Sequence, residues 1–299
     1  MSQELITKIQ SYLDKPLKKV DTIETINHDD FYKNYMSKNK PVVMTKMMDD
    51  WEASKTWSLD FFKQIGKDKN TFISKGNNFQ EDTKWEYGSF LESIERIEKS
   101  NDASQGGYLM NLSILSMFPQ LRDHVDFSLI SKFKVRDSLS FWIGPKGTLT
   151  GWHTDRLADN ILAQIKGSKL VLLANPNQSK FMYPSDKYEP GSRLSSIDMK
   201  NFDEEKFPLF KKNAQIMYYV LGPKEMIFIP KQWWHCVYGL EISISSNNFG
   251  FSASDDFKQK ANEFVKRKLH NVGLYGKNCV CHYYDDNGKR HKYGAKKSS

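Results

Sequence analysis

Short apolar runs separated by turn residues fill the chain between residues 108 and 251, and they constrain the fold more than any other feature. Runs such as SLSFWIG, QIMYYVLG and EMIFIP are rich in β-branched and aromatic residues, which strands favour. Glycine and proline turns interrupt them, for example at residues 144–147, at Gly167 and at Gly222. Many short strands with frequent turns predict a β-sandwich or barrel over this segment.

The residues before 108 follow a different pattern, in which helical spacing predominates. Apolar spacing predicts helices over 5–13, 28–40, 58–66 and 87–99, with strands at 41–47 and 71–74. The chain is therefore expected to be mainly β with flanking helices. We expect an N-terminal mixed extension (1–107), a strand-rich core (108–253), and a C-terminal helix with a basic tail (254–299).

The segment after the strand-rich core is predicted to form a long helix over residues 254–270. Ser254 is the expected N-cap, and acidic residues follow it where the helix dipole favours negative charge. Its apolar stripe consists of Phe257, Ala261, Phe264, Val265 and Leu269. Such a stripe would either pack on the core or form an interface with a second copy.

Composition narrows the class of protein. The chain has 299 residues, 39% of them hydrophobic, and this is enough for a large core. No apolar run of membrane-spanning length occurs, and the amphipathic opening lacks the apolar region of a signal peptide. Three cysteines are too few for a disulfide framework, so we expect an intracellular location, in the cytoplasm or nucleus.

The net charge of +8 is concentrated near the C-terminus. The segment KRHKYGAKKSS contains five Lys or Arg residues and no acidic residue. A solvated tail is the favoured interpretation, and contact with nucleic acid or another acidic partner is the alternative. No base-reading motif accompanies the tail.

The motif TLTGWHTD contains His153 and Asp155, separated by one residue. On a strand both side chains point to the same face, so an imidazole and a carboxylate converge there. A His-x-Asp pair alone is a weak metal signal. His235, which follows MIFIP and a turn, is the best candidate for a third ligand. Two histidines and a carboxylate form the facial triad that holds iron(II) and leaves coordination positions open.

Lys169 opens the run KLVLLA, where alternation places it on one face with Val171 and Leu173. A lysine inside a barrel requires an anionic partner, because an unpaired buried ammonium is unfavourable. A dicarboxylate that binds iron at one end, such as 2-oxoglutarate, would supply that partner. The alternative is that Lys169 lies in solvent at a strand end.

Other polar residues on the expected strands are consistent with a ligand pocket. Thr150 precedes His153 by three residues, and Tyr108 could supply a phenolic hydroxyl. In ISISSNNF one face carries Ser243, Ser245, Asn247 and Phe249, while the isoleucines share the other. A polar inner face and an apolar outer face suit a barrel that binds a polar molecule.

The motifs TLTGWHTD, NILAQIKGSK, MIFIPKQWWH and ISISSNNF together resemble the JmjC-type (cupin-8) iron(II)/2-oxoglutarate oxygenases. The likeness looks closest to the small JmjC-only hydroxylases of the factor-inhibiting-HIF type, and it extends over residues 20–255. It implies a double-stranded β-helix, or jelly-roll, core at 108–253.

The resemblance also assigns roles to individual residues. His153, Asp155 and His235 match the iron ligands. The matched co-substrate residues are Lys169, Thr150, Asn247, Tyr108 and Asn160. Asn160 stands one residue further from the His-x-Asp pair than in the relatives. Phe249 stands where the relatives have a tryptophan.

By resemblance, the chain is expected to be a dioxygenase that uses Fe(II), 2-oxoglutarate and O2 and releases succinate and CO2. The first choice of reaction is hydroxylation of a protein side chain. Demethylation of N-methyl-lysine, or hydroxylation of a small molecule or tRNA, would use the same chemistry. A catalytically inert cupin binding module is the alternative from another class. The resemblance also implies a homodimer formed through the C-terminal helix.

The C-terminal run Cys279-x-Cys281-His282, with His291 beyond it, offers zinc ligands. No second ligand pair stands at the usual spacing. Ordinary loop residues are therefore the favoured interpretation of this run.

Overall fold

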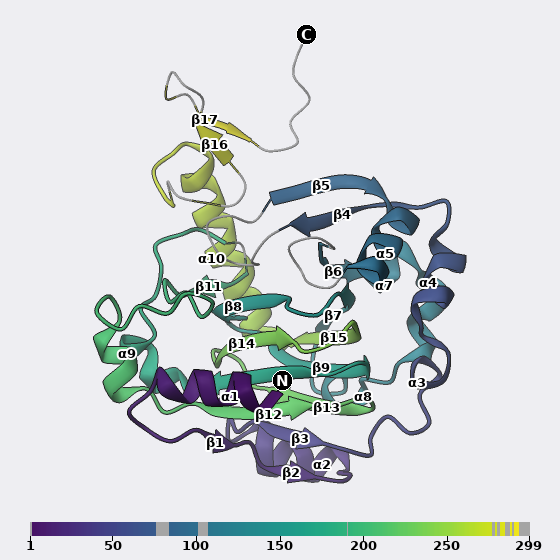
Figure 1. Cartoon of the computed structure of the whole chain (residues 1–299), viewed down its shortest axis with the longest axis horizontal. Coiled ribbons are helices and arrows are strands. Elements are labelled where there is room, and N and C mark those ends of the chain that lie inside the picture. Colours follow the sequence, from purple (N-terminus) through teal and green to yellow (C-terminus); the bar gives the residue numbers. More distant parts are fainter. Residues whose placement is uncertain are drawn as a thin grey trace.

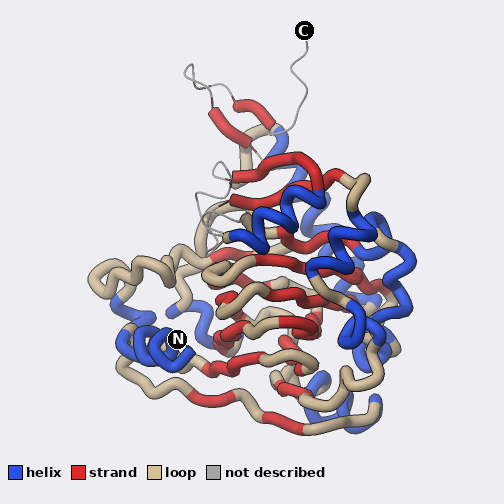
Figure 2. Tube along the Cα trace, turned by 45° about the vertical axis from the view of Figure 1, so that its right-hand side comes forward, coloured by secondary structure: helices blue, strands red, loops and turns tan. Residues whose placement is uncertain are grey.

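The computed structural model describes residues 2–75, 84–100, 107–189, 191–276, 279, 282–284, 288 and 290–292. Two β-sheets form its centre, with helices around them (Figures 1 and 2). The mainly β fold with flanking helices is thereby confirmed. Among the described residues, no helix combines the length and the apolar character needed to cross a membrane.

The first sheet has six strands. In spatial order they are β1 (Lys18–Lys19), β12 (Met217–Leu221), β10 (Lys169–Ala174), β14 (Trp234–Gly239), β8 (Leu149–Thr154) and β11 (Arg193–Leu194). The second sheet has seven strands. They are β2 (Thr22–Ile23), β3 (Val42–Met44), β13 (Glu225–Ile229), β9 (Asp159–Lys166), β15 (Ser243–Phe251), β7 (Arg136–Gly144) and β6 (Leu109–Ser113).

The sheets alternate along the chain, since β8, β10, β12 and β14 belong to the first and β7, β9, β13 and β15 to the second. This alternation is the jelly-roll arrangement that the family resemblance implied for the strand-rich segment. Three strands that precede residue 108 complete the sheets. Strand β1 pairs in parallel with β12, and β2 and β3 extend the edge beside β13.

Helices and short hairpins surround the sheets. The helical segments are α1 (Ser2–Ser11), α2 (His28–Phe31), η1 (Tyr32–Met36), α3 (Glu52–Thr56), α4 (Leu59–Gly66), α5 (Phe90–Lys99), α7 (Ile114–Met117), η2 (Pro119–His124), α8 (Ser128–Ser131), η3 (Pro176–Phe181), α9 (Pro208–Asn213) and α10 (Ala253–Asn271). The two hairpins are β4 (Asn70–Lys75) with β5 (Lys84–Ser89), and β16 (His282–Tyr284) with β17 (Arg290–Lys292).

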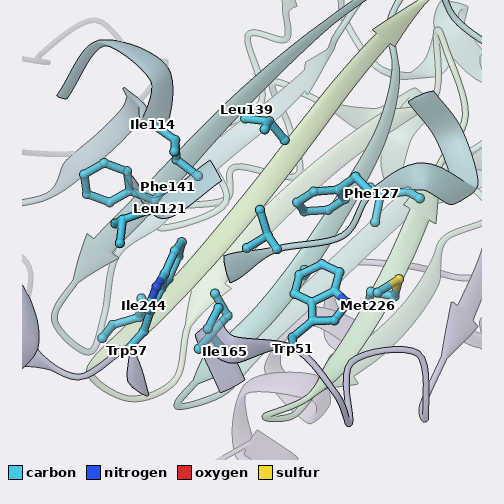
Figure 3. Close-up of a cluster of buried hydrophobic side chains, with 14 of the residues drawn as sticks. Trp51, Trp57, Ile114, Leu121, Phe127, Leu139, Phe141, Ile165, Met226 and Ile244 are labelled. Carbon is cyan, nitrogen blue, oxygen red and sulfur yellow. The ribbon is translucent and has the colours of Figure 1, made fainter. Parts of the chain in front are cut away.

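The hydrophobic core has three parts because both sheets are covered on both faces. The largest cluster lies between the second sheet and the N-terminal helices (Figure 3). Within it Phe62 of α4 stacks on Phe141 of β7, with 5.2 Å between ring centroids. Burying one such phenylalanine contributes about 1.5–3 kcal/mol to stability. A second cluster joins α1 and α9 to the first sheet, and a third lies between the sheets.

Most of the elements expected before residue 108 are present, with shifted ends. Ser58 caps α4 by accepting a hydrogen bond from the Phe61 amide, and α4 ends at Gly66 as expected. The helix expected from residue 87 begins only at Phe90, because 87–89 belong to β5 and pair with β4. The Ser89 hydroxyl accepts from the Glu92 amide and so fixes that start. The helix predicted over 28–40 ends earlier, as α2 and η1, at Met36.

Two further boundaries differ from the sequence prediction. The strand expected from residue 108 ends at Ser113, whose hydroxyl caps α7. The cap of α10 is Ser252 rather than Ser254, because Ser252 has extended backbone angles and its hydroxyl accepts from the Asp255 amide. A serine inside the first turn, such as Ser254, lacks the extended backbone of an N-cap.

The apolar stripe of α10 does not pack on the core. Phe257, Phe264, Val265 and Leu269 are exposed, Phe257 by 74%. The residues that α10 buries are instead Asp255, Gln259 and His270. Most residues of the basic tail, which was predicted to be solvated, lie outside the described residues. Two of its basic residues, Arg290 and Lys292, lie in β17.

Candidate metal and co-substrate site

His153 and His235 are brought together by strand pairing. Strand β8 pairs antiparallel with β14, and the register places His153 directly opposite His235. Their ring centroids are 4.0 Å apart although the residues are 82 positions apart in sequence. The register shifts just after this pair, between His235 and Val237. A bulge of this kind re-aims side chains and is common beside active sites.

Asp155 lies one residue beyond the end of β8, not on the strand as the His-x-Asp pattern suggested. A turn follows it, in which the Ala158 amide donates to the Asp155 carbonyl and Arg156 has a φ of 50°. The carboxylate still faces the histidines. Its Oδ1 lies 3.8 Å from His153 Nε2, and its Oδ2 lies 3.4 Å from His235 Nε2. The three ligand atoms all lie within 4.8 Å of one another.

Backbone carbonyls orient both imidazoles. His153 Nδ1 lies 2.8 Å from the Gly151 oxygen, and His235 Nδ1 lies 3.1 Å from the Trp233 oxygen. A neutral imidazole that donates from Nδ1 presents the lone pair of Nε2 toward Asp155. Burial and the neighbouring His235 hold the pKa of His153 well below its usual value. The donor set therefore fits a divalent metal, which requires neutral imidazole ligands.

Two asparagines orient the carboxylate. Asn160 Nδ2 donates to Asp155 Oδ2 at 3.0 Å, and Asn247 Nδ2 donates to Asn160 Oδ1 at 2.8 Å. These two hydrogen bonds lead from Asn247 on β15 through Asn160 on β9 to Asp155 after β8. They therefore link the two sheets at the site. Hydrogen-bonded neighbours of this kind fix the orientation of metal ligands.

Lys169 lies inside the fold rather than in solvent. Its side chain leaves β10 of the first sheet, and Nζ donates to Ser245 Oγ of the second sheet at 2.6 Å. A weaker contact of 3.5 Å joins Nζ to the hydroxyl of Tyr108. Among the described residues no carboxylate forms an ion pair with Lys169, and burial lowers its pKa to about 7. Lys169 is thus a buried amine surrounded by hydroxyl groups.

One cavity connects the triad with Lys169. Its volume is about 270 Å³, and its wall includes the three triad residues, Lys169, and all four of the other residues matched to the co-substrate. These four are Tyr108, Thr150, Asn160 and Asn247. Burial raises the pKa of Tyr108, and a hydrogen bond with Thr150 opposes that shift. The phenol is therefore neutral and can donate to an anion.

The structure thus brings all eight candidate residues to one cavity, and it adds others. Trp142 also lines the wall, and its buried indole Nε1 has no hydrogen-bond partner among the described residues. An orphaned buried donor of this kind is costly without a ligand. Alternation along SLSFWIG could have indicated Trp142, because Leu139, Phe141 and Ile143 on the other face enter the core.

Arg136 was also missed by sequence reasoning. It lines the cavity from the first position of β7, pairs with Asp256 of α10, and lies over the Phe251 ring. No local motif marks this arginine, because its partner is 120 positions away. Cys236, next to His235, points to the opposite face of its sheet and is buried in the apolar cluster there.

Comparison with known proteins assigns the chain to a family. Residues 28–257 match the family model described as "Cupin-like domain", which is most of the chain. The JmjC domain-containing protein D of Dictyostelium discoideum is 30% identical over 253 residues, which are 78% of this chain and 56% of that protein. Lysine-specific demethylase JMJ30 of Arabidopsis thaliana is 30% identical over 257 residues, 81% of this chain and 57% of that protein.

A third relative is lysine-specific demethylase 8 of Danio rerio, 28% identical over 238 residues, which are 77% of this chain and 58% of that protein. The chain thus spans little more than half the length of these curated relatives. The predicted membership of the JmjC-type cupin family is confirmed. The closer likeness to hydroxylases of the factor-inhibiting-HIF type stays a prediction.

Proposed function

The chain belongs to the cupin-like domain family, and on this premise we propose that it is an iron(II)- and 2-oxoglutarate-dependent oxygenase. The reaction proposed is the hydroxylation of a C–H bond of a protein side chain, with O2 consumed and succinate and CO2 released. The proposal rests on one observation above all. A buried lysine without a carboxylate partner among the described residues shares a cavity with a His-Asp-His triad.

The triad is proposed to hold the metal. His153 and His235 would bind through Nε2, since each Nδ1 lies within hydrogen-bond distance of a backbone carbonyl. Asp155 would bind through its carboxylate, which Asn160 orients. A bound iron(II) would supply the activation of O2 and the oxidation of 2-oxoglutarate and substrate. Three protein ligands leave coordination positions open for these molecules.

The opposite end of the cavity is proposed to bind the distal carboxylate of 2-oxoglutarate. Lys169 would form the ion pair that its burial requires. Tyr108 and Thr150 line the same part of the wall, and the indole of Trp142 could donate its unused hydrogen bond. The co-substrate would thus be held at both ends, with its orientation fixed by residues of both sheets.

The test of this chemistry does not require the prime substrate. Purified protein with iron(II), ascorbate and 2-oxoglutarate should form succinate slowly in an O2-dependent manner. His153→Ala should remove this turnover, and His28→Ala, a histidine remote from the cavity, should leave it unchanged. Failure of the unaltered protein both to retain iron and to bind 2-oxoglutarate would favour the inert binding module instead.

The substrate class is proposed separately from the chemistry of the site. Hydroxylation of a protein side chain is our first choice, and demethylation of N-methyl-lysine is the second candidate. The second is favoured by the names of two relatives, each called a lysine-specific demethylase. Mass spectrometry of peptides from a cell extract separates them, because hydroxylation adds one oxygen atom and demethylation removes a methyl group.

The proposed organisation follows the sequence prediction. Residues 108–253 would form the catalytic core, 1–107 an extension that packs on it, and 254–299 a C-terminal helix and tail. The pairing of β1–β3 with core strands supports an extension that folds together with the core. A cytoplasmic or nuclear location is proposed on the cysteine count alone.

A further inference from the structure

A second group of side chains of the types that bind metals lies at the C-terminal end of α10, and none of its members lines the cavity described above. It consists of His270, Cys279 and His282. His270 Nε2 lies 3.1 Å from His282 Nδ1, and Cys279 Sγ lies 3.5 Å from the same His282 nitrogen. All three ligand atoms lie within 4.8 Å of one another. Figure 1 shows α10 leading from the sheets toward the β16–β17 hairpin, which contains His282.

These separations are close to those of a tetrahedral zinc site. With Zn–N near 2.05 Å and Zn–S near 2.3 Å, tetrahedral angles place two nitrogens about 3.3 Å apart and nitrogen and sulfur about 3.6 Å apart. The distances in the structure, 3.1 and 3.5 Å, differ from these by a few tenths of an ångström or less. Two imidazoles and a thiolate are ligands typical of zinc.

The imidazole of His270 is oriented as a metal ligand requires. His270 Nδ1 lies 2.8 Å from the carbonyl oxygen of Tyr275, to which a neutral imidazole donates. Its Nε2 lone pair then points toward His282 and Cys279. A metal-bound histidine usually donates its other ring N–H to such a carbonyl.

The surroundings hold the three residues in place. His270 is 2% exposed, and the ring of Tyr188 lies against it with centroids 4.4 Å apart. Gly276 has a φ of 56°, and an added Cβ there would lie 2.4 Å from Tyr188 Cβ, so only glycine fits. The backbone of Cys279 forms a parallel bridge with Tyr188. The end of α10 and the segment with Cys279 and His282 thus both contribute to the cluster and both contact the segment at Tyr188.

We propose that His270, Cys279 and His282 bind a structural zinc ion. The site rests on these three described residues, and water or another side chain completes four-coordination. Cys281 lies outside the described residues, and the proposal does not depend on it. The alternative is a network of ordinary hydrogen bonds among the same side chains, which requires no metal.

The position of the site indicates what the zinc would stabilise. Tyr188 donates to Glu263 of α10 at 3.1 Å, and Glu263 pairs with Arg156 at 3.0 Å, next to Asp155. Ser192, whose carbonyl accepts from Arg156, lines the catalytic cavity. Zinc would therefore hold the loop near Tyr188 and the end of α10 against the wall of the catalytic site.

Cobalt(II) gives a test that separates this site from the triad. A thiolate ligand produces a sulfur-to-cobalt charge-transfer band in the near ultraviolet, and the His-Asp-His triad contains no sulfur. The 299-residue chain, stripped of metal under reducing conditions and titrated with cobalt, should develop this band. The band should persist in His153→Ala, which disables the triad, and zinc should displace it at one equivalent per chain.

The ligand assignments are tested by variants. Cys279→Ser should remove the charge-transfer band, and His270→Ala should remove one zinc equivalent per chain by elemental analysis. His28→Ala, a histidine outside both clusters, should retain both signals. A band that survives Cys279→Ser would contradict the assignment of that thiol.

A second measurement on the unaltered protein covers the case in which a variant fails to fold. Zinc should raise the thermal unfolding temperature of the metal-free protein, and it should do so equally in the presence of saturating iron(II). Absence of both this shift and the charge-transfer band would overturn the proposal and leave the hydrogen-bond network as the explanation.

Discussion

Single side chains at the candidate site are oriented by neighbours that lie on other strands. Asp155 lies one residue beyond the end of β8, and the hydrogen bond from Asn160 directs its carboxylate toward the histidines. Asn160 is in turn held by Asn247 from another strand. The sequence indicated both asparagines as residues of the pocket. The hydrogen bonds from Asn247 to Asn160 and from Asn160 to the carboxylate appear only in the structure.

Replacement of Asn160 by alanine tests this role. We expect Asn160→Ala to weaken iron(II) binding roughly 10- to 100-fold, because the Asp155 carboxylate loses its orienting hydrogen bond. Competition with a chromogenic chelator measures the affinity. Asn177→Ala, at an exposed position of η3, is the control and should bind iron as the unaltered protein does. Unchanged affinity in Asn160→Ala would show that the contact does not position the ligand.

Lys169→Met should have opposite effects on binding and on stability. Loss of the ammonium should weaken 2-oxoglutarate binding at least about 30-fold, with iron binding retained. The same change should raise the unfolding temperature of the ligand-free protein at neutral pH, since an amine with a pKa near 7 is destabilising when buried. Calorimetry measures both quantities, and Lys166→Met, at an exposed position, serves as control. Equal binding in both variants would refute the pocket assignment.

The lowered pKa of Lys169 also predicts a pH dependence. Its folded pKa of about 7 is below its unfolded value of 10.5, so between these values the unfolded chain binds more protons. The stability of the ligand-free protein should therefore gain a contribution as pH rises from 7 toward 10.5. Binding of 2-oxoglutarate requires the ammonium, so the affinity should fall up to about tenfold per pH unit above 7.

Calorimetric titration in buffers of different ionisation enthalpy tests this linkage directly. At pH 8 the unaltered protein should take up close to one proton on binding 2-oxoglutarate, and at pH 6 almost none. Proton uptake that is equally small at both pH values would place the pKa of the free amine well above 7.

At the scale of elements, the sequence predicted the two faces of a strand more reliably than the residue at which a helix begins or ends. The faces of β15 are as the alternation predicted, with Ser245 and Asn247 toward the site and Ile244 in the core. Helix ends depend on which serine adopts extended backbone angles. For α10 this is Ser252, two residues before the predicted cap.

The cap of α10 can be tested with two neighbouring serines. Ser252→Ala should lower the free energy of unfolding by about 1 kcal/mol, because the Asp255 amide loses its acceptor. Ser254→Ala should have little effect, since Ser254 lies inside the first turn. Chemical denaturation measures both. A larger loss in Ser254→Ala would restore the sequence-based assignment of the cap.

At the scale of the whole molecule, the exposed apolar face of α10 is the feature that the sequence could not place. Phe264 is 64% exposed, and Phe257, Val265 and Leu269 accompany it along the helix. The sequence left two interpretations open, packing on the core or association with a second copy. The described residues do not cover this stripe, which removes the first interpretation.

We therefore predict a homodimer through α10. Light scattering after size exclusion should give twice the chain mass, and Phe264→Glu should reduce it to the mass of one chain, because a charge in an apolar interface is unfavourable. Asn262→Glu introduces the same charge at another exposed position of the helix and should leave the dimer intact. A monomeric unaltered protein would refute the prediction.

The sequence by itself determined the mainly β core and the faces of its strands, because alternation and turn chemistry are local properties. It indicated the eight candidate residues as a set through the resemblance of its motifs to those of a known family. Only the tertiary structure decided what depends on distant pairing. It places His153 opposite His235 and brings the hydroxyl groups of Tyr108 and Ser245 to Lys169. Register, burial and contact across sheets are set by packing between segments remote in sequence, and no local pattern contains that information.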